Sequence, residues 1–162
     1  MEEKENNIEK LRERYDRFKE RYEIPEFIEL NKIFDIEDID SETDFLLRKV
    51  RRIISDRIAG YLRFVEIILN PSNAPMFFFK LIKKLDEEDK KHLIEIQDIL
   101  GESEVEVLKL DLNYNEEKEV EFIQKAYHLF TKKISKKLLF IVEKMGNGKN
   151  NEEKREKGSY FG

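Results

Sequence analysis

Residues 45–69 read FLLRKVRRIISDRIAGYLRFVEIIL, and this stretch decides the fold. Its apolar side chains recur at steps of three and four residues, which places them on one face of an α-helix. They are Leu46, Val50, Ile53, Ile54, Tyr61, Val65 and Ile68. Ser41 followed by Asp44 resembles a capping box before this helix, and Asn70-Pro71 is expected to end it. The sequence therefore predicts a long amphipathic helix that forms the spine of an all-α protein together with the last helix of the chain.

Similar periodicity predicts helices on both sides of this spine. Residues 5–23 carry apolar side chains at helical spacing, Pro25 ends them, and residues 26–36 follow as a short second helix. Asn115 begins the last helix, which runs to residue 145. Residues 146–162 are polar and show no apolar periodicity. We therefore expect a bundle domain over residues 1–145 and a flexible tail over 146–162.

The middle of the chain contains an aromatic run, Phe77-Phe78-Phe79. Three adjacent aromatic residues cannot share one helix face, so we expect the helix over 76–85 to fill the core. Asp86 is expected to cap the next helix and Gly101 to end it. In residues 103–114, apolar and polar side chains alternate in part, as they do in a β-strand. We favour a short helix, because no second strand is available for pairing. The prediction is a bundle of about five or six helices.

The composition restricts the classes to which this chain can belong. It has 31 basic and 36 acidic residues and a net charge of −5, so it lacks a strong positive field for nucleic acid. It has no cysteine, which excludes disulfides and thiolate metal sites. We expect a cytoplasmic protein without a signal peptide and without a membrane partner. A charged fraction of 41% is typical of hyperthermophilic proteins.

Two histidines raise one alternative, a ferritin-like bundle that binds a pair of iron or zinc ions. His92 and Glu95 share a face of one predicted helix, and Glu121 and His128 share a face of another. In such bundles, carboxylates and Glu-x-x-His pairs project into the core. Here the order His-x-x-Glu is reversed, and the other explanation is that these side chains lie on charged helix surfaces.

Basic residues form a stripe on the predicted spine helix. Arg48, Arg52 and Arg63 fall within about 60° of arc, and Lys49 and Arg51 flank them. A second ridge on the last helix consists of Lys125, Lys132 and Lys136. Two such ridges side by side could bind a polyanion or a protein partner. The alternative is that they are solvated faces paired with the many glutamates.

Catalytic motifs are not recognisable in the sequence. We find no nucleophile elbow, no phosphate-binding loop before a helix, and no histidine with a clear acid–base partner. The sequence therefore gives no catalytic residues and favours a protein that is not an enzyme.

The tail ends in two adjacent aromatic residues, Tyr160 and Phe161. Exposed aromatic residues on a polar tail are typical of segments that dock into a pocket. The ending KREKGSYFG resembles the sliding-clamp-binding box at the C-terminus of archaeal replication and repair proteins. This resemblance implies that Tyr160 and Phe161 insert into a hydrophobic pocket of the clamp.

A second resemblance concerns the body of the chain. Residues 45–69, followed by Leu85-Asp86-Glu87-Glu88-Asp89, resemble the helical domain of archaeal GINS replication proteins. It implies a non-catalytic scaffold for the replicative helicase. Together the two resemblances predict an interaction protein that binds partners through its helical surface and its tail. The sequence leaves open whether the chain forms homo-oligomers.

Overall fold

A computed structural model describes residues 2–147. All regular structure in this range is helical, which confirms the all-α prediction. The helices are α1 (Glu2–Lys19), α2 (Phe27–Phe34), α3 (Leu46–Leu69), α4 (Met76–Ile82), α5 (Glu87–Leu112), α6 (Glu116–Leu129) and α7 (Ser135–Gly146). Short 3₁₀ turns occupy Ile36–Asp38 and Pro71–Asn73, and a π-helical segment, Phe130–Ile134, joins α6 to α7. Over residues 2–147, no helix combines the length and the apolarity that a bilayer crossing requires.

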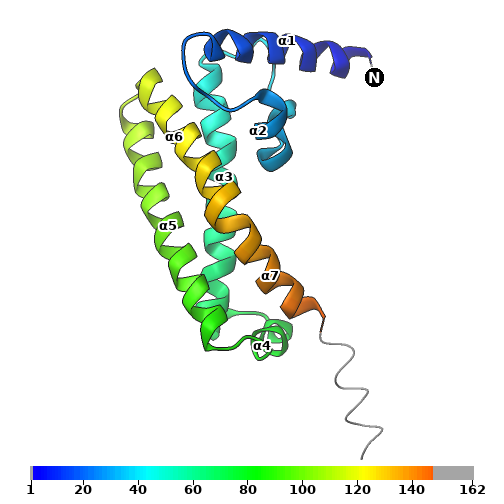
Figure 1. Ribbon diagram of the computed structural model, residues 1–162, viewed down its shortest axis with the longest axis vertical. Coiled ribbons are helices and arrows are strands. Elements are labelled where there is room, and N and C mark those ends of the chain that lie inside the picture. The colour runs from blue at the N-terminus through cyan, green and yellow to red at the C-terminus, as the bar shows by residue number, and fades with distance from the viewer. Residues whose placement is uncertain (1, 148–162) are drawn as a thin grey trace, which may run out of the picture.

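Helix α3 is the spine of the bundle, as the sequence predicted. Helix α5 runs antiparallel beside it, and the rod formed by α6 and α7 starts next to the end of α5 and crosses α3 (Figure 1). Helices α1 and α2 lie at the end where α3 begins, and α4 lies at the opposite end. The core fills the space between these helices with buried aliphatic and aromatic side chains, among them Val50, Ile54, Ile58, Leu93, Ile96, Leu100, Ile123 and Ile134.

Helix α3 ends at Leu69 as predicted, but the predicted capping box is wrong. The helix begins at Leu46 after Phe45, whose φ of 51° is left-handed, and no side chain caps it. The preceding loop is held by α1 instead. The Ser41 N–H donates to Asn7 Oδ1 at 2.8 Å, and Arg14 donates to the carbonyl oxygens of Ser41 and Thr43. These hydrogen bonds bind the loop to α1, and no side chain of the loop caps α3.

Helix α4 corrects the prediction that the aromatic run fills the core. None of its residues is buried, and Phe77 is 58% exposed. Leu81 and Ile82 at its end pack partly against the core, and Leu85 beyond it is buried. A helix of two turns that is anchored by its last residues leaves its first turn in solvent.

Helix α5 is capped as predicted but does not end at Gly101. The Asp86 carboxylate accepts from the backbone N–H groups of Glu88 and Asp89, and the Asp89 side chain accepts from the Asp86 N–H. The helix continues to Leu112, because the buried stripe continues past Gly101 to Val107 and Leu110. Residues 103–112 are therefore part of one long helix, not a separate short one.

The π-helical segment between α6 and α7 has a cause in the sequence. The buried residues Ala126, Phe130, Ile134 and Leu138 are four residues apart. In an α-helix of 3.6 residues per turn, three such steps rotate the apolar face by about 120°. A π-turn absorbs the extra residue, so that the apolar face stays on the core along the whole rod.

Candidate functional site

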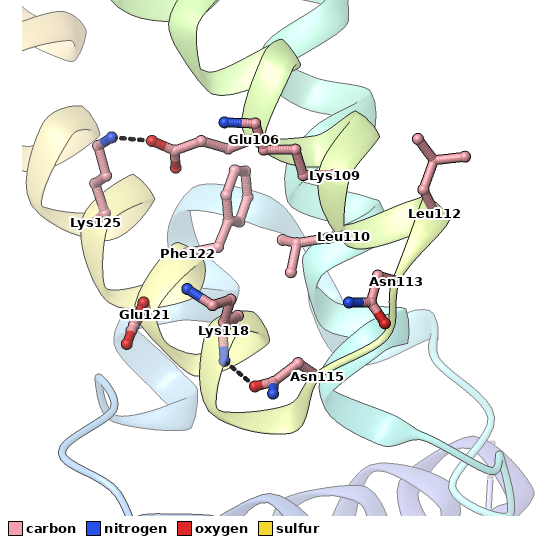
Figure 2. Close-up of a pocket in the computed structure, with 10 residues that line it drawn as sticks. All are labelled: Glu106, Lys109, Leu110, Leu112, Asn113, Asn115, Lys118, Glu121, Phe122 and Lys125. Atoms are coloured by element: carbon pink, nitrogen blue, oxygen red, sulfur yellow. Dashed lines mark hydrogen bonds and ion pairs between the residues drawn. The ribbon is translucent and has the colours of Figure 1, made fainter.

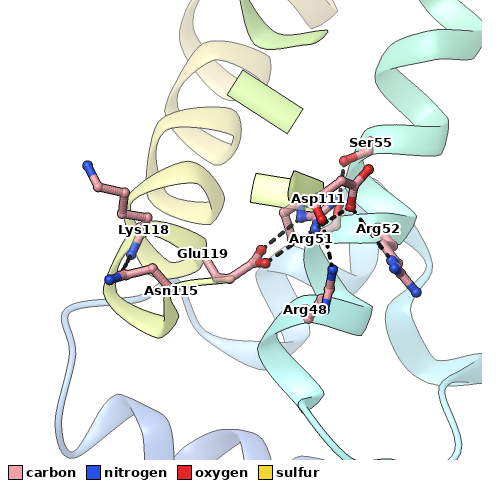
Figure 3. A network of polar contacts seen from close by, with 8 residues as sticks. All are labelled: Arg48, Arg51, Arg52, Ser55, Asp111, Asn115, Lys118 and Glu119. Carbon is pink, nitrogen blue, oxygen red and sulfur yellow. Dashed lines mark hydrogen bonds and ion pairs between the residues drawn. The ribbon is translucent and has the colours of Figure 1, made fainter. Parts of the chain in front are cut away.

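A buried ion pair joins α3 to α6 close to the α5–α6 connection. Arg51 is 1% exposed, and its Nε donates to Glu119 Oε2 at 2.8 Å (Figure 3). Its Nη2 donates to Glu119 Oε1 at 3.3 Å and to Asp111 Oδ1 at 2.8 Å. Desolvation lowers the pKa of Arg51, but the hydrogen bonds to Glu119 and Asp111 more than offset it, so the pKa is raised. Arg51 therefore remains charged and fixes the three helices relative to one another.

The connection between α5 and α6 is held by further contacts. The last helix begins after Asn115, as predicted, and Asn115 also caps it, because its Oδ1 accepts from the Lys118 N–H at 3.0 Å. Tyr22 and Arg21, which follow α1, both donate to Glu116 Oε1, at 2.9 Å and 2.8 Å. The first turn of α6 is thus tied to both α3 and the end of α1, which gives the side chains around it a fixed position.

A cavity opens beside this connection. It has a volume of about 600 Å³ and lies between the last turns of α5 and the first turns of α6 (Figure 2). This volume is within the range of about 300–1,000 Å³ that ligand pockets have. We refer to it as the α5–α6 pocket. It is lined by Glu106, Lys109, Leu110, Leu112, Asn113, Asn115, Lys118, Glu121, Phe122 and Lys125.

The α5–α6 pocket has an apolar floor and a charged rim. Leu110 and Phe122 point toward each other across the floor, and Leu112 lies at the outer edge, 88% exposed. The rim carries lysines from both helices, Lys109 from α5 and Lys118 and Lys125 from α6. Lys125 pairs with Glu106 across the pocket. Glu121 is a second acidic side chain of the lining, so the rim holds three lysines and two glutamates. Because Lys125 is paired with Glu106, the pocket can bind a group that is apolar on one side and places acidic groups against Lys109 and Lys118.

The three arginines of the predicted basic stripe, Arg48, Arg52 and Arg63, do not lie together in the structure. The Arg48 guanidinium lies 5.6 Å from the centre of the Tyr114 ring, and its Nη2 donates to the Asp111 carbonyl oxygen at 3.4 Å. Arg52 Nε lies 4.0 Å from Asp111 Oδ1. Arg63 is exposed and lies eleven residues beyond Arg52, about 16 Å along the helix axis. Arg48 and Arg52 therefore share Asp111, and Arg63 is remote from them.

The four residues of the alternative metal site are not brought together. His92 and Glu95 lie in the first half of α5, and Glu95 pairs with Lys137 of α7 at 2.7 Å. Glu121 lines the α5–α6 pocket, near the other end of α5, and His128 is exposed on α6. Between residues 2 and 147, no three histidine, aspartate or glutamate side chains are grouped so that they could hold a metal ion.

The predicted docking residues Tyr160 and Phe161 lie outside the described residues. The α5–α6 pocket itself was not predicted from the sequence. In the sequence, its floor residues Leu110 and Phe122 have the pattern of ordinary core positions, and its lysines have the pattern of a solvent-exposed helix face. One signal was present: Leu108 and Leu112 are apolar residues outside the buried stripe of α5, and such residues indicate an additional contact surface.

No protein-family model, curated protein or solved structure matches this chain. The resemblances to archaeal GINS proteins and to the clamp-binding box therefore stay predictions from the sequence.

Proposed function

We propose that this chain is an interaction protein that binds an acidic amphipathic helix of a partner in the α5–α6 pocket. The observation that supports this most directly is the combination of an apolar floor with lysines on both sides. Recognition of a helix in a groove uses apolar anchors spaced three or four residues apart, with charged flanks that fix its orientation. Leu110, Phe122 and Leu112 supply the apolar contacts.

The charges around the pocket determine the kind of partner. Lys109 and Lys118 make no ion pair with the residues that the structure describes. Lys125 is already paired with Glu106, so Lys109 on α5 and Lys118 on α6 are the rim lysines that can meet carboxylates of a bound helix. The whole chain has a net charge of −5 and would repel an acidic partner at long range. Attraction must therefore come from these nearby lysines.

The proposal can be tested with two labelled peptides in a fluorescence anisotropy titration. One peptide is an amphipathic helix with a leucine stripe flanked by glutamates, and the other has lysine in place of each glutamate. The acidic peptide should bind and the basic one should not. Lys118→Glu should weaken binding about tenfold, because it reverses a rim charge. Lys132→Glu makes the same charge change outside the pocket and should leave binding unchanged.

Two results would contradict the proposal. One is that neither peptide binds. The other is that Lys118→Glu and Lys132→Glu weaken binding equally, which would show a dependence on net charge instead of a defined site.

We propose that the C-terminal tail is a second element through which the same protein binds a partner. Its Tyr160 and Phe161 resemble the aromatic plug of a sliding-clamp-binding box, and this resemblance suggests a role in replication. We expect a peptide of residues 148–162 to bind an archaeal sliding clamp in isothermal titration calorimetry, and Phe161→Ala to abolish the heat signal. If the unaltered peptide gives no signal, the clamp proposal fails while the α5–α6 pocket proposal stands.

A further inference from the structure

Helix α5 has two apolar faces, and only one of them is covered. The buried face contains Leu93, Ile96, Leu100, Val107 and Leu110. The outer face contains Ile94, Gly101, Val105, Leu108 and Leu112, and all four of its side chains larger than glycine are exposed. At 100° per residue these five positions fall within about 60° of arc, on the side of α5 away from the buried face. We refer to them as the outer stripe.

The outer stripe has the spacing of a helix–helix seam. Ile94, Gly101 and Leu108 are seven residues apart, and so are Asp98, Val105 and Leu112. Apolar residues in such a seven-residue repeat pack against a second helix. At Gly101, an added Cβ would meet nothing within 4 Å, so the centre of the outer stripe is open to a close approach. Figure 1 shows α5 at the edge of the bundle, with no described helix on its outer side.

We propose that two copies of this chain associate through the outer stripe, with their α5 helices antiparallel. In a symmetric antiparallel pair centred near residue 103, Ile94 of one copy meets Leu112 of the other, and Gly101 meets Val105. The apolar contacts then extend over about 27 Å of helix.

Charge decides between the antiparallel and the parallel arrangement. Asp98 interrupts the outer stripe, and in a parallel pair it would face Asp98 of the second copy. In the antiparallel pair it faces Leu108 and lies beside Lys109 of the second copy, so two opposite-charge contacts replace one like-charge contact. Glu102 of both copies lies on the flank near the symmetry axis, and this repulsion limits the affinity. A single helix pair of this length buries less than the roughly 1,600 Å² of a standard interface, so we expect a dissociation constant in the micromolar range.

Sedimentation velocity of the full chain between 1 and about 200 µM tests self-association, since this range brackets a micromolar constant. The chain should shift from monomer to dimer over the range. Leu108→Glu should keep it monomeric. Leu139→Glu on α7 is the matched control, because Leu139 is 59% exposed and Leu108 is 60% exposed, and it should leave the dimer intact. Circular dichroism verifies that both variants fold.

Disulfide formation tests the antiparallel orientation of the two α5 helices. Because the chain contains no cysteine, only the introduced cysteines can form disulfides. Chains with Gly101→Cys are mixed with chains with Val105→Cys, and the mixture is oxidised. The antiparallel pair predicts that mixed disulfides dominate. Dominant disulfides between identical chains would overturn the antiparallel arrangement. A monomer at every concentration, or equal loss of dimer in Leu108→Glu and Leu139→Glu, would overturn the interface itself.

Discussion

Among single residues, Arg51 and Glu119 form a buried ion pair, so each charge depends on the other for its stabilisation, whereas the charges of an exposed pair are also solvated by water. Both side chains are buried, and the pair is bidentate. Removing one partner leaves the other charge in an environment that cannot solvate it, whereas replacing both with apolar residues removes the problem. The pair therefore contributes to the precise placement of α6 more than its net contribution to stability suggests.

Glu119→Ala should lower the free energy of unfolding by about 3–5 kcal/mol, because it strands the Arg51 charge in the core. The double variant Arg51→Met/Glu119→Leu should recover most of this loss. Urea denaturation followed by circular dichroism measures both. A loss below about 1 kcal/mol in Glu119→Ala would show that water or Asp111 alone satisfies Arg51, as in an exposed pair.

At the scale of elements, the start of α5 depends on a cap that responds to pH. The hydrogen bond from Lys144 and the backbone N–H groups of Asp89 and Glu88 lower the pKa of Asp86 to about 2. A carboxylate whose pKa is lower in the folded state stabilises the fold above its unfolded pKa. This stabilisation is lost as the pH falls from the ordinary value of 3.8 through about 2.

Asp86→Ala should lower the melting temperature at pH 6 by about 2–4 °C, because α5 loses its N-cap. The difference from the unaltered chain should narrow as the pH approaches 2. Asp86→Asn keeps an N-cap oxygen but loses the charge. Its melting temperature should therefore lie between those of Asp86→Ala and the unaltered chain. Differential scanning calorimetry at several pH values provides the comparison. A difference that stays constant down to pH 2 would show that the Asp86 charge is not involved.

The sequence predicts individual elements well where the signal is local. The sequence predicts Asp86 as a cap, Asn115 as the start of the last helix and Asn70-Pro71 as the end of α3, because each acts on the backbone within a few residues. A local signal fails where tertiary contacts decide: Ser41 and Asp44 do not cap α3, because the loop that carries Ser41 is bound to α1. Gly101 does not end α5 because the buried stripe passes through it, and Phe77 is exposed because only the last residues of α4 reach the core.

The candidate site could be predicted only in part, for the same reason. Its lysines and leucines are visible in the sequence, but the α5–α6 pocket exists only because α5 and α6 meet at a particular angle. The basic stripe shows the limit most clearly. The sequence places Arg51 among the cations that flank the stripe, whereas in the structure its side chain is buried and donates to Glu119. One-dimensional spacing indicates a shared face but does not tell which charges that face buries.

At the scale of the whole molecule, α5 connects the two proposed contacts. One side of its C-terminal half lines the α5–α6 pocket, and the outer stripe lies next to it, with Leu112 at the border of both. A dimer built on the outer stripe would carry two α5–α6 pockets and could bind two partner segments. Linked partner segments would then bind more tightly than single ones, because the second contact forms within one complex.

Binding of an acidic amphipathic helix in the α5–α6 pocket can be observed residue by residue in an NMR titration. Amide resonances of the ¹⁵N-labelled chain are followed while the acidic peptide is added. We predict that the largest shifts fall on residues 106–125, on both sides of the pocket. Shifts concentrated on α4 or α7, or no shifts at a large excess of peptide, would show that the peptide does not bind in the α5–α6 pocket.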